Sequence, residues 1–132
     1  MNDKLTSIFN QKGPQRLEIF KQNFLDDTIF EEFIDSCLFD EINLVNCYFD
    51  GSEFLGTIFI SCSFENCTFK NTTIRKSKFT NCEFKSKNIT FDNLQFNEVN
   101  LMKIFKSKET FYLTESITIT NFLKFQKEIL QI

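Results

Sequence analysis

The chain has 132 residues, a mass of 15.7 kDa, a formal net charge of −3 and a pI of about 5.0. These values predict one domain without general attraction for nucleic acid or anionic membranes. It contains 19 Phe but no Trp and no His, which excludes the commonest general base and zinc ligand. No stretch approaches the roughly 18 apolar residues of a membrane span, and residues 1–16 lack a signal-peptide run, so we expect a cytoplasmic protein.

Residues 1–27 predict a lead-in or cap before the main domain. Leu17, Phe20 and Phe24 would share one face of a helix, which allows a short helix over residues 15–24. The alternative is an extended segment leading into the first repeat. Residues 28–31, TIFE, have the form of a capping box, but the Phe-rich segment around them favours β-structure from about residue 28.

A five-residue period dominates the middle of the chain, and it defines two columns of residues. The central column holds large apolar residues: Phe39, Leu44, Phe49, Phe54, Phe59, Phe64, Phe69, Ile74, Phe79 and Phe84. The column two residues earlier is mostly small and contains every cysteine: Cys37, Ile42, Cys47, Ser52, Thr57, Cys62, Cys67, Thr72, Ser77 and Cys82. A period of five fits neither an α-helix nor a strand.

Such a period fits a coil in which each block turns the backbone by a quarter. Four blocks, or about 20 residues, then close one coil, and successive coils stack at roughly 4.8 Å. In each block one small and one large residue point inward, and each central Phe lies against the Phe of the next coil. The outward residues, rich in Asn and Ser, are turn formers at the corners.

These blocks resemble the pentapeptide-repeat family, whose members form a right-handed quadrilateral β-helix. The segments CTFKN, SKFTN and CEFKS match its pattern directly, with Cys in place of the usual Ala. The match is weaker over residues 19–36, where Gln22, Asp27 and Glu32 interrupt the small column. The resemblance implies an all-β protein, with a β-helix of about four coils over residues 28–105.

Beyond residue 86 two columns compete. One column continues the five-residue spacing of the central column and contains Ile89, Leu94, Val99 and Ile104. The other lies two residues later and contains Phe91, Phe96 and Leu101. We interpret this segment as a last, wider coil in which both inward residues are bulky. Atypical end units of this kind are needed to cover the core of a solenoid.

Residues 106–132 predict a capping segment and a short amphipathic C-terminal helix. Phe122, Phe125, Ile129 and Ile132 have helical spacing, and Thr120 or Asn121 could be the N-cap. The helix could cover the open end of the rod or pair with a second chain. Covering the end is the more common role in general, whereas the resemblance implies the second alternative, because related proteins often dimerise through their C-terminal ends.

The residues that could carry chemistry are interpreted as structural. The cysteines lack zinc-knuckle spacing, and stacking places Cys47 beside Cys67 and Cys62 beside Cys82 as buried small side chains. The acidic run from Asp26 to Glu41 is a solvated surface with no nucleophile near it. We therefore expect no catalytic residue, no metal, no cofactor and no enzymatic activity.

The outward apolar residues are the best functional candidates. Leu38, Ile58 and Ile60 should share one outer face, while Tyr48 and Leu55 point outward on others. Such a cluster suggests a contact surface. The alternative is that the N-terminal segment folds back and covers it.

The sequence therefore predicts a non-catalytic interaction module of the adaptor, regulatory or toxin-neutralising type, with an unidentified protein partner and no nucleic-acid or membrane partner. The resemblance adds an alternative, since some family members mimic DNA and protect type II topoisomerases (gyrase) from quinolones or toxins. A DNA mimic needs a long, strongly negative rod. Residues 37–99 have eight acidic and six basic side chains, a net charge of only −2, and about four coils span roughly 20 Å.

Overall fold

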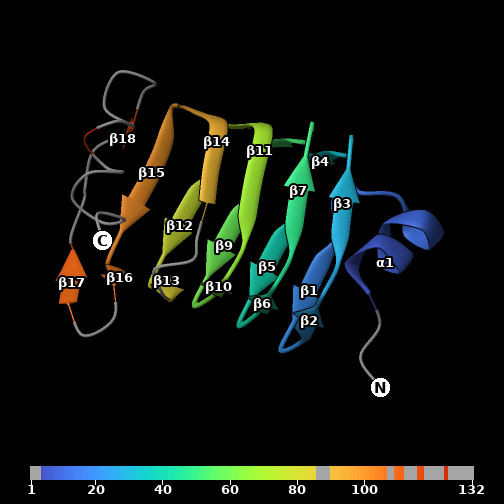
Figure 1. Cartoon of the computed structure of the whole chain (residues 1–132), viewed down its shortest axis with the longest axis horizontal. Helices are drawn as coiled ribbons and strands as arrows, with labels where there is room; N and C mark the ends of the chain where they lie inside the picture. The colour runs from blue at the N-terminus through green and yellow to red at the C-terminus, as the bar shows by residue number, and fades with distance from the viewer. Residues whose placement is uncertain (1–3, 86–89, 107–108, 112–115, 118–123, 125–132) are drawn as a thin grey trace.

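The computed structural model describes residues 4–85, 90–106, 109–111, 116–117 and 124. They form a short helix, α1 (Leu5–Lys12), followed by a right-handed quadrilateral β-solenoid of about four coils (Figure 1). The coils follow one another along the long axis, and α1 lies at the N-terminal end (Figure 1). The predicted fold class is confirmed. No helix in the described ranges is long and apolar enough to cross a membrane.

Parallel ladders build the four faces. Face 1 contains β1 (Glu18–Phe20), β5 (Leu38–Asp40), β9 (Ile58–Ile60), β12 (Lys78–Thr80) and β15 (Val99–Met102), to which β18 (Ser116–Ile117) adds antiparallel. Face 2 contains β2 (Asn23–Leu25), β6 (Asn43–Val45), β10 (Ser63–Glu65), β13 (Glu83–Lys85) and β16 (Ile104–Lys106), with β17 (Glu109–Phe111) antiparallel at its edge.

Faces 3 and 4 share two longer strands. Face 3 begins with β3 (Thr28–Phe30) and β7 (Tyr48–Asp50), and face 4 begins with β4 (Phe33–Asp35) and β8 (Glu53–Leu55). β11 (Thr68–Arg75) and β14 (Thr90–Asn97) continue through both faces and pair with each other. The pairing between these two strands continues on both sides of the corner, where Asn71 and Asn93 still turn the backbone with φ of +48° and +57°.

The register confirms the predicted stacking. Phe39 pairs with Phe59 at an offset of 20 residues. After Phe84 the offset becomes 22, because Phe69 pairs with Phe91 and Phe79 with Leu101. Phe91, Phe96 and Leu101 therefore continue the central column, whereas Leu94, Val99 and Ile104 take the positions of the small column.

In this last coil the small column holds Leu94, Val99 and Ile104, and the central column holds Phe96 and Leu101. All five side chains are buried. Two bulky residues per block thus fill the C-terminal part of the core, as the sequence predicts for a wider end coil.

Stacked phenylalanine rings fill the middle of the rod. The rings of Phe39 and Phe59 have centroids 5.1 Å apart, Phe59 and Phe79 are 4.4 Å apart, and Phe49 and Phe69 are 5.0 Å apart with nearly parallel planes. Rings on adjacent faces meet at tilted angles with centroid distances of 5.5 to 6.5 Å. Both arrangements are favourable for aromatic quadrupoles.

Each described corner turns at the residue two places after the central one, which adopts φ between +48° and +69°. This left-handed conformation favours Gly and Asn, and Gly51 and Gly56 occupy two of the corners. Asn side chains also bond between coils: Asn66 donates to Asn46, and Asn46 donates to Asp26 at 3.0 Å. The outward Asn side chains at these corners therefore form ladders of hydrogen bonds along the edges of the rod.

The N-terminal segment differs from its expected form. The helix lies at residues 5–12 rather than 15–24, and residues 18–20 already form β1, ahead of the boundary expected at residue 28. Phe24 is fully buried, but Phe20 is 48% exposed, so these residues do not share a helical face. The five-residue register imposed by the neighbouring coil overrides the local helical pattern.

Helix α1 covers the N-terminal end of the core. Leu5 and Phe9 are buried there. Asp27, which interrupts the small column, is 2% exposed and accepts hydrogen bonds from the Thr6 backbone N–H at 3.1 Å and the Thr6 hydroxyl at 2.9 Å. The carboxylate thus caps the first turn of α1, whose N–H groups have no intrahelical partner.

The helix that the structure describes is N-terminal and not C-terminal as the sequence predicts. Its N-terminal position follows from the cap at Asp27 and from Leu5 and Phe9, which bury the apolar end of the first coil. Residues 118–123 and 125–132, on which the predicted C-terminal helix falls, lie outside the described residues.

Replacing Asp27 by Ala should destabilise the docked helix by about 1–2 kcal/mol, the usual cost of a lost N-cap. The readout is hydrogen exchange of the α1 amides, which should become faster while the coils from residue 37 onward stay protected. Asp27→Asn keeps one acceptor oxygen and should have a smaller effect. Unchanged exchange in Asp27→Ala would contradict the capping role.

Replacing Phe64 by Ala should lower the free energy of unfolding by about 3–5 kcal/mol, as truncation of a buried Phe does. Cys67→Ala removes little volume and should cost about 1 kcal/mol. Phe30→Ala is the matched control, because Phe30 is exposed and its loss should stay within about 0.5 kcal/mol. Urea denaturation measures all three, and equal costs for Phe64 and Phe30 would refute the packing.

Candidate interaction surface

The five cysteines line the inner corners. All are buried and none is in a disulfide. Their thiols donate to backbone carbonyls of the preceding coil; Cys62 Sγ lies 3.2 Å from the Phe39 oxygen, and Cys67 Sγ lies 3.3 Å from the Leu44 oxygen. The small column is therefore both a packing element and a source of bonds between coils.

Burial and neighbouring thiols raise the pKa of three of the five cysteines, whereas the hydrogen bond with the stacked partner thiol lowers the pKa of Cys47 and of Cys62. The side-chain hydrogen bond with Cys47, together with burial, holds the pKa of Cys67 well above its usual range. Burial raises the pKa of Cys37 and, with the adjacent Cys62 thiol, that of Cys82. A protonated buried thiol is a poor nucleophile and a poor metal ligand. Among the described residues no cluster of three or more His, Cys, Asp or Glu could hold a metal ion.

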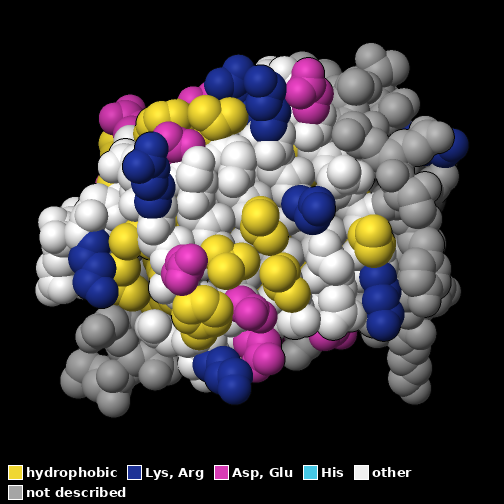
Figure 2. Space-filling view, turned by 180° about the vertical axis from the view of Figure 1, so that it is seen from behind, with side chains coloured by type: hydrophobic (Ala, Val, Ile, Leu, Met, Phe, Trp, Pro, Cys, Tyr) yellow, Lys and Arg dark blue, Asp and Glu magenta, His cyan; other side chains and the backbone are white. Residues whose placement is uncertain are grey.

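Face 1 carries an apolar patch, which we define as Phe20, Leu38, Ile58 and Ile60. The register places Leu38 directly beside Ile58, and Phe20, Asp40 and Ile60 form the adjacent column. Ile58 is 39% exposed, and Leu38 and Ile60 are partly exposed. Figure 2 shows hydrophobic side chains gathered in the middle of this face, with acidic and basic side chains around them. The sequence correctly predicts that Leu38, Ile58 and Ile60 share a face.

The other predicted interface residues are placed elsewhere. Tyr48 lies on face 3 and Leu55 on face 4, both partly exposed. The structure therefore does not gather them into the apolar patch, although Leu55 precedes the Gly56 corner that leads to Ile58. Phe122, Phe125 and Ile129 lie outside the described residues, so their expected role at a C-terminal interface stays a prediction.

The N-terminal segment does not cover the apolar patch. Its helix packs at the end of the rod, where Ile8 and Leu17 lie partly buried against the core. Intramolecular cover by residues 4–17 is thus absent from face 1.

Several exposed apolar residues were not predicted from the sequence. Phe20, Leu25, Phe30 and Phe33 lie on the four successive faces of the first coil, and Met102 lies on β15 of face 1. Three of them immediately follow a central residue, a position that always points outward. The five-residue frame, whose central column reaches back to Ile19, points them outward, but the helical alternative for residues 15–24 placed Phe20 on the same face as Phe24.

Charge on face 1 changes sign along the rod. The N-terminal side carries Glu18 and Asp40, and the C-terminal side carries Lys78, which occupies the strand next to Ile58. Within the described part of the chain, the ion pair found is Arg75 with Glu53 on face 4, with Nε and Oε1 3.1 Å apart. The charges of face 1 are therefore directed at solvent.

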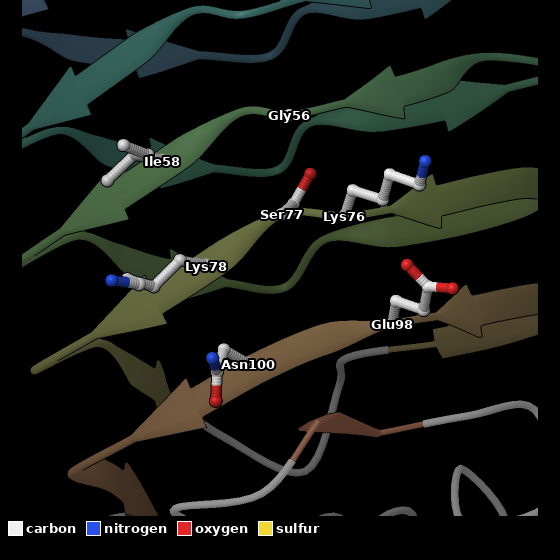
Figure 3. Close-up of a pocket in the computed structure, with 7 residues that line it drawn as sticks. All are labelled: Gly56, Ile58, Lys76, Ser77, Lys78, Glu98 and Asn100. Atoms are coloured by element: carbon white, nitrogen blue, oxygen red, sulfur yellow. The ribbon is translucent and has the colours of Figure 1, made fainter.

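A shallow hollow adjoins the apolar patch at the corner between faces 4 and 1. It is lined by Gly56, Ile58, Lys76, Ser77, Lys78, Glu98 and Asn100 (Figure 3). The absence of a side chain at Gly56 opens it, and the two lysines extend in opposite directions (Figure 3). Ser77 is satisfied by the Arg75 carbonyl and the Thr57 N–H. Five of the seven residues that line the hollow are polar or charged.

The repeat region is similar to a known protein family, and the chain is similar to a solved structure. Residues 59–101 match the family model described as Pentapeptide repeats (9 copies). Among solved structures, a trypsin-treated form of QnrB1, a plasmid-mediated fluoroquinolone resistance protein, is similar at 8% identity and a TM-score of 0.25. That alignment covers 71% of this chain and 76% of the other. No curated protein matches the sequence.

Proposed function

Since the chain belongs to the pentapeptide-repeat family, we propose that it is a non-catalytic interaction module that binds a partner protein through face 1. The module is of the adaptor, regulatory or toxin-neutralising type. The observation that carries this proposal is the apolar patch, which is held on a rigid sheet face with Asp40 between Phe20 and Ile60 and with Lys78 beside Ile58. Protein interfaces commonly combine an apolar centre with a polar rim.

The rigidity of the face favours binding. Leu38, Ile58 and Ile60 project from strands whose neighbouring residues are anchored in the phenylalanine stack. The backbone on which they stand is bonded to the coil on either side; for example, the Ile58 N–H donates to the Cys37 oxygen at 2.9 Å. Few groups on this surface therefore lose conformational freedom when a partner binds, which lowers the entropic cost of association.

The DNA-mimic function is an alternative that the charge distribution disfavours. Lys70, Arg75, Lys76 and Lys78 give the third and fourth coils basic side chains on several faces. A mimic of the phosphate backbone would instead need negative charge along its full length. Supercoiling by gyrase, measured with and without micromolar protein, separates the two functions: the interaction module leaves it unchanged, and protection or inhibition would favour the mimic.

The proposal predicts that Leu38→Asp/Ile58→Asp abolishes capture of the partner in a quantitative pull-down from the source cells. Two charges in the centre of an interface leave buried, unpaired carboxylates, which commonly costs several kcal/mol of binding. Leu25→Asp/Val45→Asp makes the same change on face 2 and is the matched control. Thermal unfolding verifies that both variants fold. Retention of every partner by the face 1 variant would refute the assignment.

A further inference from the structure

Face 1 is self-complementary when one copy is reversed against another. Its five parallel strands place β9 in the middle, with β1 and β5 on one side and β12 and β15 on the other. A two-fold axis lying in the face, along β9, opposes β5 to β12 and β1 to β15. Closed two-fold contacts of this type are the commonest form of protein self-association.

We propose that the partner recognised by face 1 is a second copy of this chain, bound in this reversed orientation. The inference deepens the proposed function and rests on its use of face 1 as a binding surface. It differs from the C-terminal pairing expected from the sequence, because the contact is lateral and uses described residues of the coils.

The apolar side chains match under this symmetry. Ile58 and Ile60 lie on the axis and meet their own copies. Phe20 lies opposite Met102, and each is 48% exposed in the single chain. Thioether–aromatic contacts are favourable, so the reversal covers with each other the two most exposed apolar side chains among those the structure describes on face 1.

The charges also match. The reversal places Lys78 opposite Leu38, and Asp40 follows Leu38 by two residues on the same strand, about 7 Å away. A lysine side chain spans that distance, so each Lys78 reaches the Asp40 of the other copy. Neither group has an ion-pair partner among the described residues. Lys21 and Lys103 approach at the exposed rim, where salt screens their repulsion.

The size of the face sets the strength of the contact. The five parallel strands of face 1, with the two-residue strand β18 at one edge, make a narrow strip at a spacing of about 4.8 Å, below the roughly 800 Å² per partner of a standard interface. We therefore expect a weak dimer, with a dissociation constant in the micromolar range or above.

Sedimentation equilibrium from about 10 µM to about 1 mM protein tests the proposal over the range expected for a weak interface. The full chain should show a monomer–dimer equilibrium. Ile58→Asp should weaken it at least about 100-fold, because two carboxylates meet on the axis. Leu25→Asp on face 2 should leave it unchanged. A monomer at every concentration, or a dimer that survives Ile58→Asp, would overturn the proposal.

Charge reversal identifies the second copy as the partner. Asp40→Lys and Lys78→Asp should each weaken the homodimer by about fivefold, because each change removes two symmetric pairs. An equimolar mixture of these two variants should form heterodimers more tightly than either variant forms homodimers, since both pairs are then opposite in sign. The double variant Asp40→Lys/Lys78→Asp should return to within about twofold of the original chain. Lack of recovery in both arms would refute the reversed register.

Failure of this inference is distinguishable from failure of the proposed function. A chain that stays monomeric, yet loses a captured protein on Leu38→Asp/Ile58→Asp, uses face 1 for a different partner. A monomeric chain whose partners are unaffected by that change uses face 1 for neither purpose.

Discussion

The parallel ladder between coils is the constraint on which the rest of the structure depends. It holds each residue directly beside the residue one coil away, at about the 4.8 Å spacing of hydrogen-bonded strands. Each position of the five-residue block therefore becomes a line of similar side chains along the rod. Phe stacks on Phe in the centre, Cys lies beside Cys at the inner corner, and Asn bonds to Asn at the outer corner.

The same constraint explains why both ends depart from the repeat. An unbroken ladder would leave a phenylalanine core open to water at each end. At the N-terminal end, Asp27 replaces a small residue and binds Thr6, so that α1 is held across the core. At the C-terminal end, two additional residues after Phe84 shift the register and bring a second bulky column inward.

The ladder also leaves the outward side chains as the ones available for contact with other molecules. The inward positions are occupied by packed side chains, including five buried cysteines that form no disulfide. Outward residues are free to vary without disturbing the core, and on face 1 they form an apolar centre with acidic and basic ends. A flat, hydrogen-bonded face of this kind suits the proposed recognition of another protein surface.

The sequence by itself determined the solenoid, the central and small columns, and the shared face of Leu38, Ile58 and Ile60, because a strict period of five allows one way of burying its large residues. Tertiary structure decided the rest. The helix at Leu5–Lys12 depends on a bond to a carboxylate 21 residues away, which no local pattern encodes. Exposure of Phe20 depends on β1 pairing with β5, and the register after Phe84 depends on which of two apolar columns pairs with the coil before it. Each is a contact between coils, and the free energy of such contacts outweighs local propensity.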